Sequence, residues 1–236
     1  MKNIYIITGA AGGMGKECAF KFKDKGDLIL SGLNLDELES LKKELNSSNR
    51  VESIKCDTTN KEDLQNLLEL TKKMGKLKGI LHFAGVSEAF GNPQKIMEIN
   101  LVGTALLIET LAPIFNDETV IINTSSMTSY TAPVIKEADE LMKNPLKENF
   151  INEISKYLNN DNNISYYLSK RGVRLLTERY ATEYGKTRVI SISPGVILTP
   201  MVEDAMKNHT EVLKQMIENT PVKRIGKPED ISALVE

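Results

Sequence analysis

A tyrosine and a lysine lie one helical turn apart in the segment Tyr166-Tyr167-Leu168-Ser169-Lys170. This spacing places the side chains of Tyr166 and Lys170 on the same face of a helix. A free phenol titrates near about 10, too high for a base at neutral pH, and a neighbouring ammonium group favours the phenolate. Such a pair can exchange a proton with a carbonyl or alcohol oxygen. Taken alone, the pair is common and is more often solvated than catalytic.

A glycine-rich segment follows the first apolar run and reads Thr8-Gly9-Ala10-Ala11-Gly12-Gly13-Met14-Gly15. Glycine at 9 permits a tight turn, glycine at 13 lets the backbone approach a pyrophosphate, and glycine at 15 allows close helix packing. The helix that begins here offers free N–H groups and partial positive charge to phosphates. Because the cluster lies between a predicted strand and a predicted helix, it favours dinucleotide binding over a turn without a ligand.

The elements that must position these residues alternate along the chain. Six apolar runs rich in Ile, Val or Leu are typical of strands covered on both faces, namely Ile4–Thr8, Leu28–Ser31, Val51–Lys55, Gly79–Phe83, Val120–Thr124 and Val189–Ile192. Helical spacing separates them, with shared faces formed by Met14, Cys18 and Phe22, by Leu38, Leu41 and Leu45, and by Leu64, Leu67 and Leu68 with Leu70 nearby. The alternation predicts an α/β fold, a doubly wound parallel sheet (Rossmann) with strand order 3-2-1-4-5-6.

The segment 127–163 interrupts this alternation. It contains Pro133, Pro145 and a polar stretch at Asn159–Asn163, with helical patterns at Glu137–Lys143 and Leu146–Leu158. Structureless connections longer than about 12–15 residues are uncommon. The sequence therefore predicts an inserted helical hairpin within a single domain of residues 1–236.

Two further positions lie at predicted strand ends. Asp57 follows the third strand, where its carboxylate either accepts from an adenine amino group or caps the helix that begins near Asn60. Both interpretations stay open on the sequence. Ala84 and Gly85 end the fourth strand, where a small side chain lets the backbone approach a cofactor ribose.

Several motifs occur in a fixed order at the predicted strand ends: Thr-Gly-xxx-Gly-x-Gly at 8–15, Asn100, Ser126, Tyr166-xxx-Lys170, and Pro194-Gly195 with Thr199. In this combination the chain resembles the short-chain dehydrogenase/reductase family, single-domain type, over essentially its whole length. The resemblance implies that Tyr166 is the general acid/base. Lys170 is implied to lower the pKa of Tyr166 and to bond the nicotinamide ribose. Ser126 is implied to orient the substrate carbonyl, and Asn100 to hold a water between Lys170 and solvent.

The resemblance also implies a set of cofactor contacts. The phosphates are expected at Thr8, Gly9, Gly13 and Met14, the adenine at Asp57, and the ribose at Ala84 and Gly85. The nicotinamide end is expected at Pro194, Gly195 and Thr199, with Tyr166 and Lys170 alongside. Ser125, next to the catalytic serine position, is interpreted as a packed or capping residue.

The chain departs from the family pattern after the fourth strand. The family often has Asn-Asn-Ala-Gly, whereas this chain has His82-Phe83-Ala84-Gly85. We interpret His82 as a packed core histidine in place of an asparagine that joins neighbouring strands, and Phe83 as a locally packed side chain.

A second departure concerns the choice of cofactor. The second strand ends in Ser31-Gly32-Leu33-Asn34, which contains neither the acidic residue typical of NAD enzymes nor the basic residue typical of NADP enzymes. The lack of a carboxylate removes repulsion of a 2′-phosphate, and Ser31 or Asn34 can bond to it. The sequence thus favours NADP narrowly, with NAD as the alternative.

The insertion is the third departure, since 40 positions separate Ser126 from Tyr166. A similar insertion occurs in the bacterial 3α-hydroxysteroid dehydrogenase/carbonyl reductase branch, where it covers the helix face that other members use to dimerise. The resemblance implies a homodimer or homotetramer with an altered interface, and an apolar wall above the site. The alternative is a surface elaboration without a role in substrate binding. The segment Met201–Asn219 carries methionines at helical spacing, which form either core or a lid over an apolar substrate.

These observations predict an NAD(P)-dependent oxidoreductase acting on an apolar ketone or secondary alcohol, with a hydroxysteroid as one candidate. The alternatives are a nucleotide-sugar epimerase or dehydratase, a cofactor-sensing regulator on the same fold, and a Ser126–Lys170 hydrolase. The epimerase class favours a different glycine spacing, a regulator has no need of all four catalytic residues, and no nucleophile elbow surrounds Ser126.

Composition excludes other classes. The 236 residues carry a formal net charge of −2, which gives no electrostatic footprint for nucleic acid or an anionic membrane. The two cysteines, Cys18 and Cys56, are too few for a disulfide framework, and no metal site is expected. No apolar run approaches the about 18 residues of a membrane span, and no signal peptide is apparent, so we expect a cytoplasmic protein. Because the chain stops at Glu236, inside the helix predicted after Arg224, we expect the native protein to continue.

Overall fold

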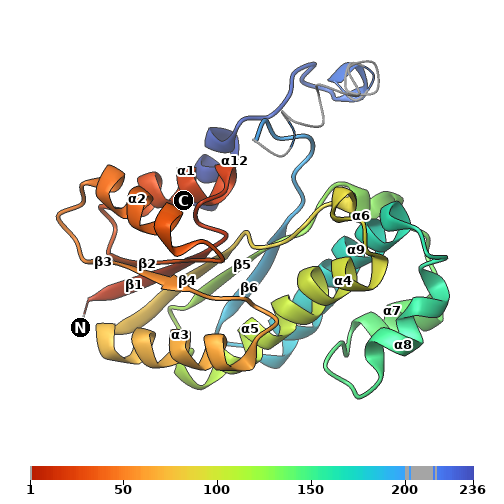
Figure 1. The fold of residues 1–236 in the computed structure, drawn as a ribbon, viewed down its shortest axis with the longest axis horizontal. Coiled ribbons are helices and arrows are strands. Elements are labelled where there is room, and N and C mark those ends of the chain that lie inside the picture. Colours follow the sequence, from red (N-terminus) through yellow and green to blue (C-terminus); the bar gives the residue numbers. More distant parts are fainter. Residues whose placement is uncertain (1, 200–201, 203–214, 216) are drawn as a thin grey trace.

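A parallel sheet of six strands forms the centre of the computed structural model, which describes residues 2–199, 202, 215 and 217–236 (Figure 1). The strand order is β3-β2-β1-β4-β5-β6, as predicted. The strands are β1 (Asn3–Thr8), β2 (Asp27–Gly32), β3 (Val51–Lys55), β4 (Lys76–His82), β5 (Val120–Thr124) and β6 (Arg188–Ile192). Since all pairs are parallel, the carboxyl ends of these strands meet at one edge of the sheet.

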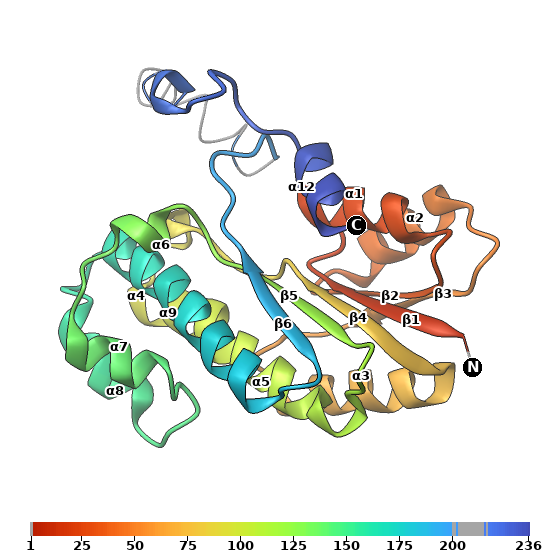
Figure 2. The same cartoon turned by 180° about the vertical axis from the view of Figure 1, so that it is seen from behind.

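Helices cover both faces of the sheet (Figures 1 and 2). One face carries α1 (Gly13–Phe22), α2 (Leu35–Leu45) and α12 (Pro228–Val235). The other carries α3 (Lys61–Met74), α4 (Pro93–Met97), η2 (Glu98–Val102), α5 (Gly103–Leu111) and α9 (Asn162–Glu183). Two apolar clusters result, one on each face, and the leucines predicted for the inner faces of α2 and α3 are buried in them. Met14 and Leu70 are only partly buried.

The insertion forms short helices packed outside α9 (Figure 1). They are α6 (Thr128–Thr131), α7 (Lys136–Met142), α8 (Phe150–Ile154) and η4 (Ser155–Tyr157). The predicted helix over Leu146–Leu158 is wrong at its start, because Asn149 has a left-handed backbone (φ 62°) and α8 begins after it. Asp139 of α7 forms a paired ion contact with Arg171 of α9 at 2.6 and 2.7 Å, which fixes the insertion to that helix.

One continuous helical run, Pro93–Ile114, ends in η3 (Ala112–Ile114) and carries Asn100. Among the described residues it is the one run that is long and apolar enough, by length and composition only, to cross a membrane. The expectation that no apolar run approaches the length of a membrane span was therefore wrong. The helix contains polar residues such as Asn100 and Thr104, but its mean hydropathy over 18 residues is still 1.4. In the fold the run is a core helix, since Leu101, Leu107 and Ile108 are fully buried.

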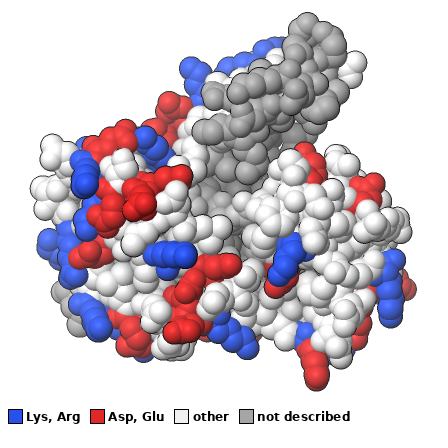
Figure 3. Space-filling model, in the orientation of Figure 1, with Lys and Arg blue, Asp and Glu red and all other residues white. Residues whose placement is uncertain are grey.

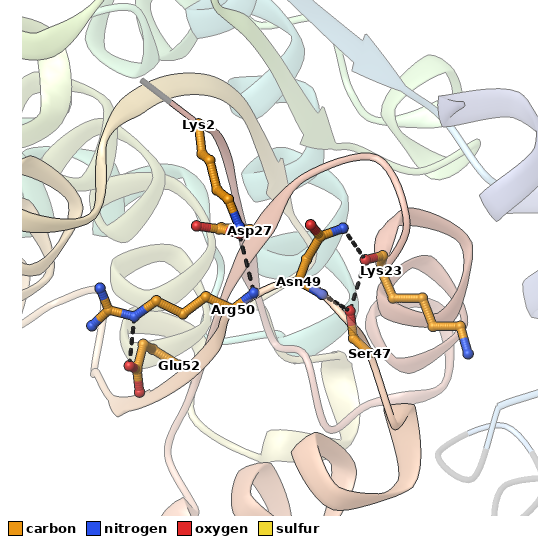
Figure 4. Close-up of polar contacts among 7 residues, drawn as sticks. All are labelled: Lys2, Lys23, Asp27, Ser47, Asn49, Arg50 and Glu52. Carbon is orange, nitrogen blue, oxygen red and sulfur yellow. Dashed lines mark hydrogen bonds and ion pairs between the residues drawn. The ribbon is translucent and has the colours of Figure 1, made fainter.

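Polar contacts connect the residues at the amino ends of β2 and β3 (Figure 4). They lie at the opposite end of these strands from the carboxyl ends, where the sequence motifs are found. The buried carboxylate of Asp27 accepts from the backbone N–H of Arg50 at 3.1 Å, and Asn49 donates to the carbonyl of Lys23. On the outside, Lys and Arg are intermixed with Asp and Glu over the face drawn in Figure 3.

Candidate active site

The turn between β1 and α1 lies directly against the end of β4. Gly9 has a left-handed backbone (φ +62°), and a Cβ there would lie 2.9 Å from the backbone nitrogen of Ala84. At Gly15 a Cβ would collide with the carbonyl of Gly9, so α1 can pack this closely only with glycine. Gly13 and Met14 open α1 at the same edge. The glycines thus produce the tight, open-backboned turn that a pyrophosphate needs.

The four predicted catalytic residues come from three different elements and converge at this edge. Ser126 follows β5, Asn100 lies in η2, and Tyr166 and Lys170 share a face of α9. The Ser126 side chain is close enough to Tyr166 to lower the pKa of its phenol, and the Lys170 ammonium lies 5.9 Å from the centroid of the Tyr166 ring. A Cβ at Gly85 would lie 3.0 Å from Asn100 Oδ1 and 3.5 Å from Lys170 Nζ. The structure therefore brings all four together, with Gly85 leaving the space between two of them.

Lys170 is buried and is held by the end of β5. Its ammonium donates to the carbonyl oxygen of Thr124 at 3.0 Å. Burial lowers the pKa of Lys170 from 10.5 to about 8, because the charged form loses solvation.

The pKa of Tyr166 is shifted in the direction opposite to the one expected from the sequence. Burial raises the pKa of Tyr166, and the Glu88 carboxylate also raises it, while the hydrogen bond with Ser126 lowers it. Lys170, which was expected to lower this pKa, is not among the groups that shift it, and desolvation of the phenolate is the largest effect. The phenol is therefore neutral at physiological pH.

Asn100 is fixed by backbone and side-chain partners. Its amide accepts from the N–H of Val86 at 2.8 Å and donates to the carbonyl of Val86 at 2.9 Å and to Ser169 Oγ at 3.0 Å. It lies in a π-helical turn, a local distortion frequent at functional sites. The hydroxyl of Thr104 donates to the Asn100 carbonyl at 2.6 Å.

The two adjacent serines differ as predicted. Ser125 is buried and donates to the carbonyl of Lys170 at 2.8 Å, so it packs α9 against the sheet. Ser126 accepts from the backbone N–H of Thr128 at 3.2 Å and retains its hydroxyl hydrogen for another partner.

The adenine end of the predicted site is only partly as expected. Asp57 accepts from the N–H and the hydroxyl of Thr59 at 2.8 and 2.7 Å, and the helix cap of α3 is Asn60. The alternative that Asp57 itself caps this helix was therefore wrong. The Ser31 hydroxyl is buried, and its contact with a cofactor stays a prediction. Asn34 uses its side-chain oxygen to cap α2.

Thr8 is likewise enclosed. Its hydroxyl accepts from the N–H of Ala84 at 3.2 Å and lies 2.7 Å from a ring nitrogen of His82. Its side chain therefore joins the end of β1 to the end of β4. His82 itself is a buried core residue, as predicted.

At the nicotinamide end, the loop after β6 lies against the segment after β5. The carbonyl of Pro194 accepts from the N–H of Met127 at 2.9 Å, and Thr199 accepts from the N–H of Val202. An open cleft of about 290 Å³ follows, lined by Gly195, Ile197 and residues of the returning segment, including Ile217 and Ile225. Most of the predicted lid, Met201–Asn219, lies outside the described residues. In the part of the chain that the structure describes, no three His, Cys, Asp or Glu side chains group as metal ligands.

A glycine turn for a pyrophosphate, next to a buried serine and lysine and a half-buried tyrosine, defines a nucleotide-dependent oxidoreductase of the doubly wound α/β class. The family description "short chain dehydrogenase" matches residues 3–138, and "Enoyl-(Acyl carrier protein) reductase" matches residues 131–235. The chain belongs to the short-chain dehydrogenase/reductase family and is an NAD(P)-dependent oxidoreductase.

Individual relatives extend the match over almost the whole chain. A 7alpha-hydroxysteroid dehydrogenase of Escherichia coli (strain K12) is 28% identical, with 96% of this chain and 83% of that protein covered. Levodione reductase of Leifsonia aquatica is 27% identical, with 98% of this chain and 85% of that protein covered. A crystal structure of levodione reductase superposes with a TM-score of 0.79 at 25% identity and covers 99% of this chain and 88% of that one.

Proposed function

We propose that this protein interconverts a ketone and a secondary alcohol, with Tyr166 as the general acid/base. The observation that carries the proposal is the placement of Tyr166 next to Ser126, which lowers the pKa of its phenol, and 5.9 Å from the buried ammonium of Lys170. The backbone at Gly9 and Gly85 fits a nicotinamide dinucleotide, because neither position has room for a side chain. A Cβ at Gly9 would contact the backbone of Ala84, and a Cβ at Gly85 would contact Asn100 Oδ1. The nicotinamide group supplies the hydride when it is bound.

The protein residues handle the proton. Tyr166 is neutral at physiological pH, so it donates its phenolic proton to the substrate oxygen in the reduction direction. Ser126 donates a second hydrogen bond to the same oxygen, where negative charge develops. The Lys170 ammonium, held by the Thr124 carbonyl, stabilises the phenolate that remains. Asn100 and Lys170 both lie beside Gly85, and Asn100 is proposed to hold the water through which Lys170 exchanges protons.

The proposed substrate is an apolar ketone, with a hydroxysteroid as one candidate. Three large side chains just after Ser126 are exposed: Met127 by 47%, Tyr130 by 68% and Val134 by 75%. Exposed apolar side chains gathered beside a polar site are typical of a ligand-binding wall. The names of the relatives, which include a hydroxysteroid dehydrogenase, support the same class.

We propose NADP(H) as the preferred cofactor, since no carboxylate lies in the segment Ser31–Asn34 to repel a 2′-phosphate. With the Ser31 hydroxyl buried, the amide nitrogen of Asn34 is the donor left from the two predicted ones. The preference is tested by the ratio of kcat/KM for NADPH and NADH, and a higher value for NADH would reverse it.

We further propose a cytoplasmic homo-oligomer that does not use the outer face of α9. The insertion 127–163 covers this face, with Met142 of α7 against Gly172 and Asp139 paired with Arg171. Sedimentation of the purified protein tests the assembly, and a monomer at micromolar concentration would contradict it.

The catalytic proposal is tested by oxidation of NADPH and NADH against steroid ketones, quinones, small cyclic ketones and 3-ketoacyl thioesters. We expect turnover with apolar cyclic ketones. Absence of turnover with every carbonyl, despite measurable cofactor binding, would instead indicate a protein that senses the cofactor.

A further inference from the structure

His82 lies at the carboxyl end of β4, in the middle of the sheet (Figure 1), and is 2% exposed. Both ring nitrogens have partners. Nδ1 lies 2.7 Å from the hydroxyl of Thr8, and Nε2 lies 2.9 Å from the hydroxyl of Thr104. Thr8 ends the strand that leads into the glycine turn, and Thr104 lies one turn after Asn100. The ring therefore bridges the cofactor side and the catalytic side of the site.

The direction of every hydrogen bond in this bridge can be deduced. The Thr104 hydroxyl lies 2.6 Å from the Asn100 carbonyl, which can only accept, so its single hydrogen points there. Thr104 must then accept from His82, which places the ring hydrogen on Nε2. Nδ1 of a neutral ring accepts, so the Thr8 hydroxyl donates to it and in turn accepts from the N–H of Ala84. The bridge has no missing donor or acceptor.

The ring stays neutral, which this arrangement requires. Burial, with a smaller contribution from the Lys170 ammonium, lowers the pKa of His82 to about 3. A protonated ring would carry hydrogens on both nitrogens and would leave the Thr8 hydroxyl without its acceptor. The ring is hydrogen-bonded to two hydroxyls, and among the described residues Lys170 is the one charged group that shifts its pKa, in the direction that disfavours the charged form.

The backbone of His82 contributes a second connection to the site. Its carbonyl oxygen accepts from the Thr124 hydroxyl at 2.7 Å, and the Thr124 carbonyl accepts from Lys170. We propose that His82, as the neutral Nε2–H tautomer, is a positioning residue that sets the Asn100 turn and the Lys170 ammonium relative to the cofactor turn. This role rests on the proposed oxidoreductase function and goes beyond the joining of neighbouring strands.

The first test removes the Thr104 hydroxyl, which transmits the bridge to Asn100. Thr104→Val should lower kcat about 10-fold while the Kd for NADPH stays within about two-fold, because one net hydrogen bond on the catalytic side is lost. Thr104→Ser keeps the hydroxyl and should restore kcat to within about two-fold.

Thr177→Val is the matched control. Thr177 is also a buried helical threonine that donates to the carbonyl four residues before it, at 2.7 Å, and accepts from a buried side chain, Asn123. Its loss should destabilise the fold similarly without changing kcat by more than about two-fold. Equal losses of kcat in Thr104→Val and Thr177→Val would overturn the positioning role.

The second test does not depend on turnover. The sequence has two histidines, so nitrogen-15 spectra of the wild type and of His209→Gln assign the His82 ring directly. We expect the Nε2–H tautomer, no titration between about pH 5 and 8, and a shift of the Asn100 side-chain amide in Thr104→Val but not in Thr177→Val. An Nδ1–H ring, a titration near about 6.5, or an unmoved Asn100 amide would overturn the inference. A wild type inactive on every carbonyl would refute the proposed function while leaving these spectra decisive.

Discussion

Replacement of Lys170 by methionine should stabilise the fold at neutral pH. The pKa of this lysine falls from 10.5 in the unfolded chain to about 8 in the folded protein because the ammonium is buried. This lowering of the pKa means that burying the charged ammonium reduces the free energy of unfolding by roughly 3 kcal/mol. Lys170→Met removes this cost and loses the hydrogen bond to Thr124, which contributes about 1 kcal/mol. The expected net gain at pH 7 is therefore about 2 kcal/mol, together with loss of activity.

The sign of the pH dependence makes this prediction specific. Between about pH 8 and 10.5 the unfolded state binds a proton at Lys170 that the folded state does not, so wild-type stability rises with pH in this range. Lys170→Met lacks this contribution, so its advantage should shrink as pH rises, vanish near about pH 10 and reverse by about pH 10.5. Urea unfolding of both proteins at intervals from pH 7 to 10.5 measures the difference, in which the other titrating groups cancel. A difference that stays constant over this range, or a variant less stable at pH 7, would refute the reasoning.

The remaining predictions concern the site and the insertion. Gly85→Ala should lower kcat at least about 10-fold, because its Cβ would lie 3.0 Å from Asn100 Oδ1 and 3.5 Å from Lys170 Nζ; steady-state kinetics with a melting curve check this. Leu33→Arg, at an exposed position, should raise the NADPH to NADH ratio of kcat/KM about 10-fold through a charge-assisted contact with a 2′-phosphate, and an unchanged ratio would place the adenosine elsewhere. Asp139→Asn should cost about 2 kcal/mol by removing the negative charge and one of the two oxygens paired with the buried guanidinium of Arg171; chemical unfolding measures this, and a loss of kcat without a loss of stability would contradict a purely structural role.

Much of the fold was predictable because its signals are local. Continuous Ile, Val and Leu runs are typical of buried parallel strands, and the six predicted runs became β1 to β6 in the predicted order. The glycine turn was equally predictable, since Gly9 and Gly15 occupy positions where a Cβ would collide with backbone. The convergence of Ser126, Tyr166 and Lys170 followed from their places at the ends of neighbouring elements.

What the sequence did not reveal depends on three-dimensional surroundings. The sign of the Tyr166 pKa shift is a competition between burial and neighbouring groups, and burial is not visible in a motif. Ser31 has a suitable hydroxyl at a suitable strand end, but its side chain is buried in the structure. The predicted helix start at Leu146 failed because Asn149 adopts a left-handed backbone. The role of Thr104 was not anticipated, although its place one turn after Asn100 and the unusual His82 were available signals.

The central claim is that Tyr166 transfers the proton while other residues bind the cofactor. Tyr166→Phe removes only the hydroxyl, so it tests this claim most directly in one preparation. The rate of NADPH oxidation with a reducible ketone and the Kd for NADPH by fluorescence are measured together. We predict a fall in kcat of at least about 100-fold, the scale of general acid catalysis, with the Kd unchanged within about two-fold. A variant that keeps activity within a few-fold of the wild type would contradict the assignment of Tyr166.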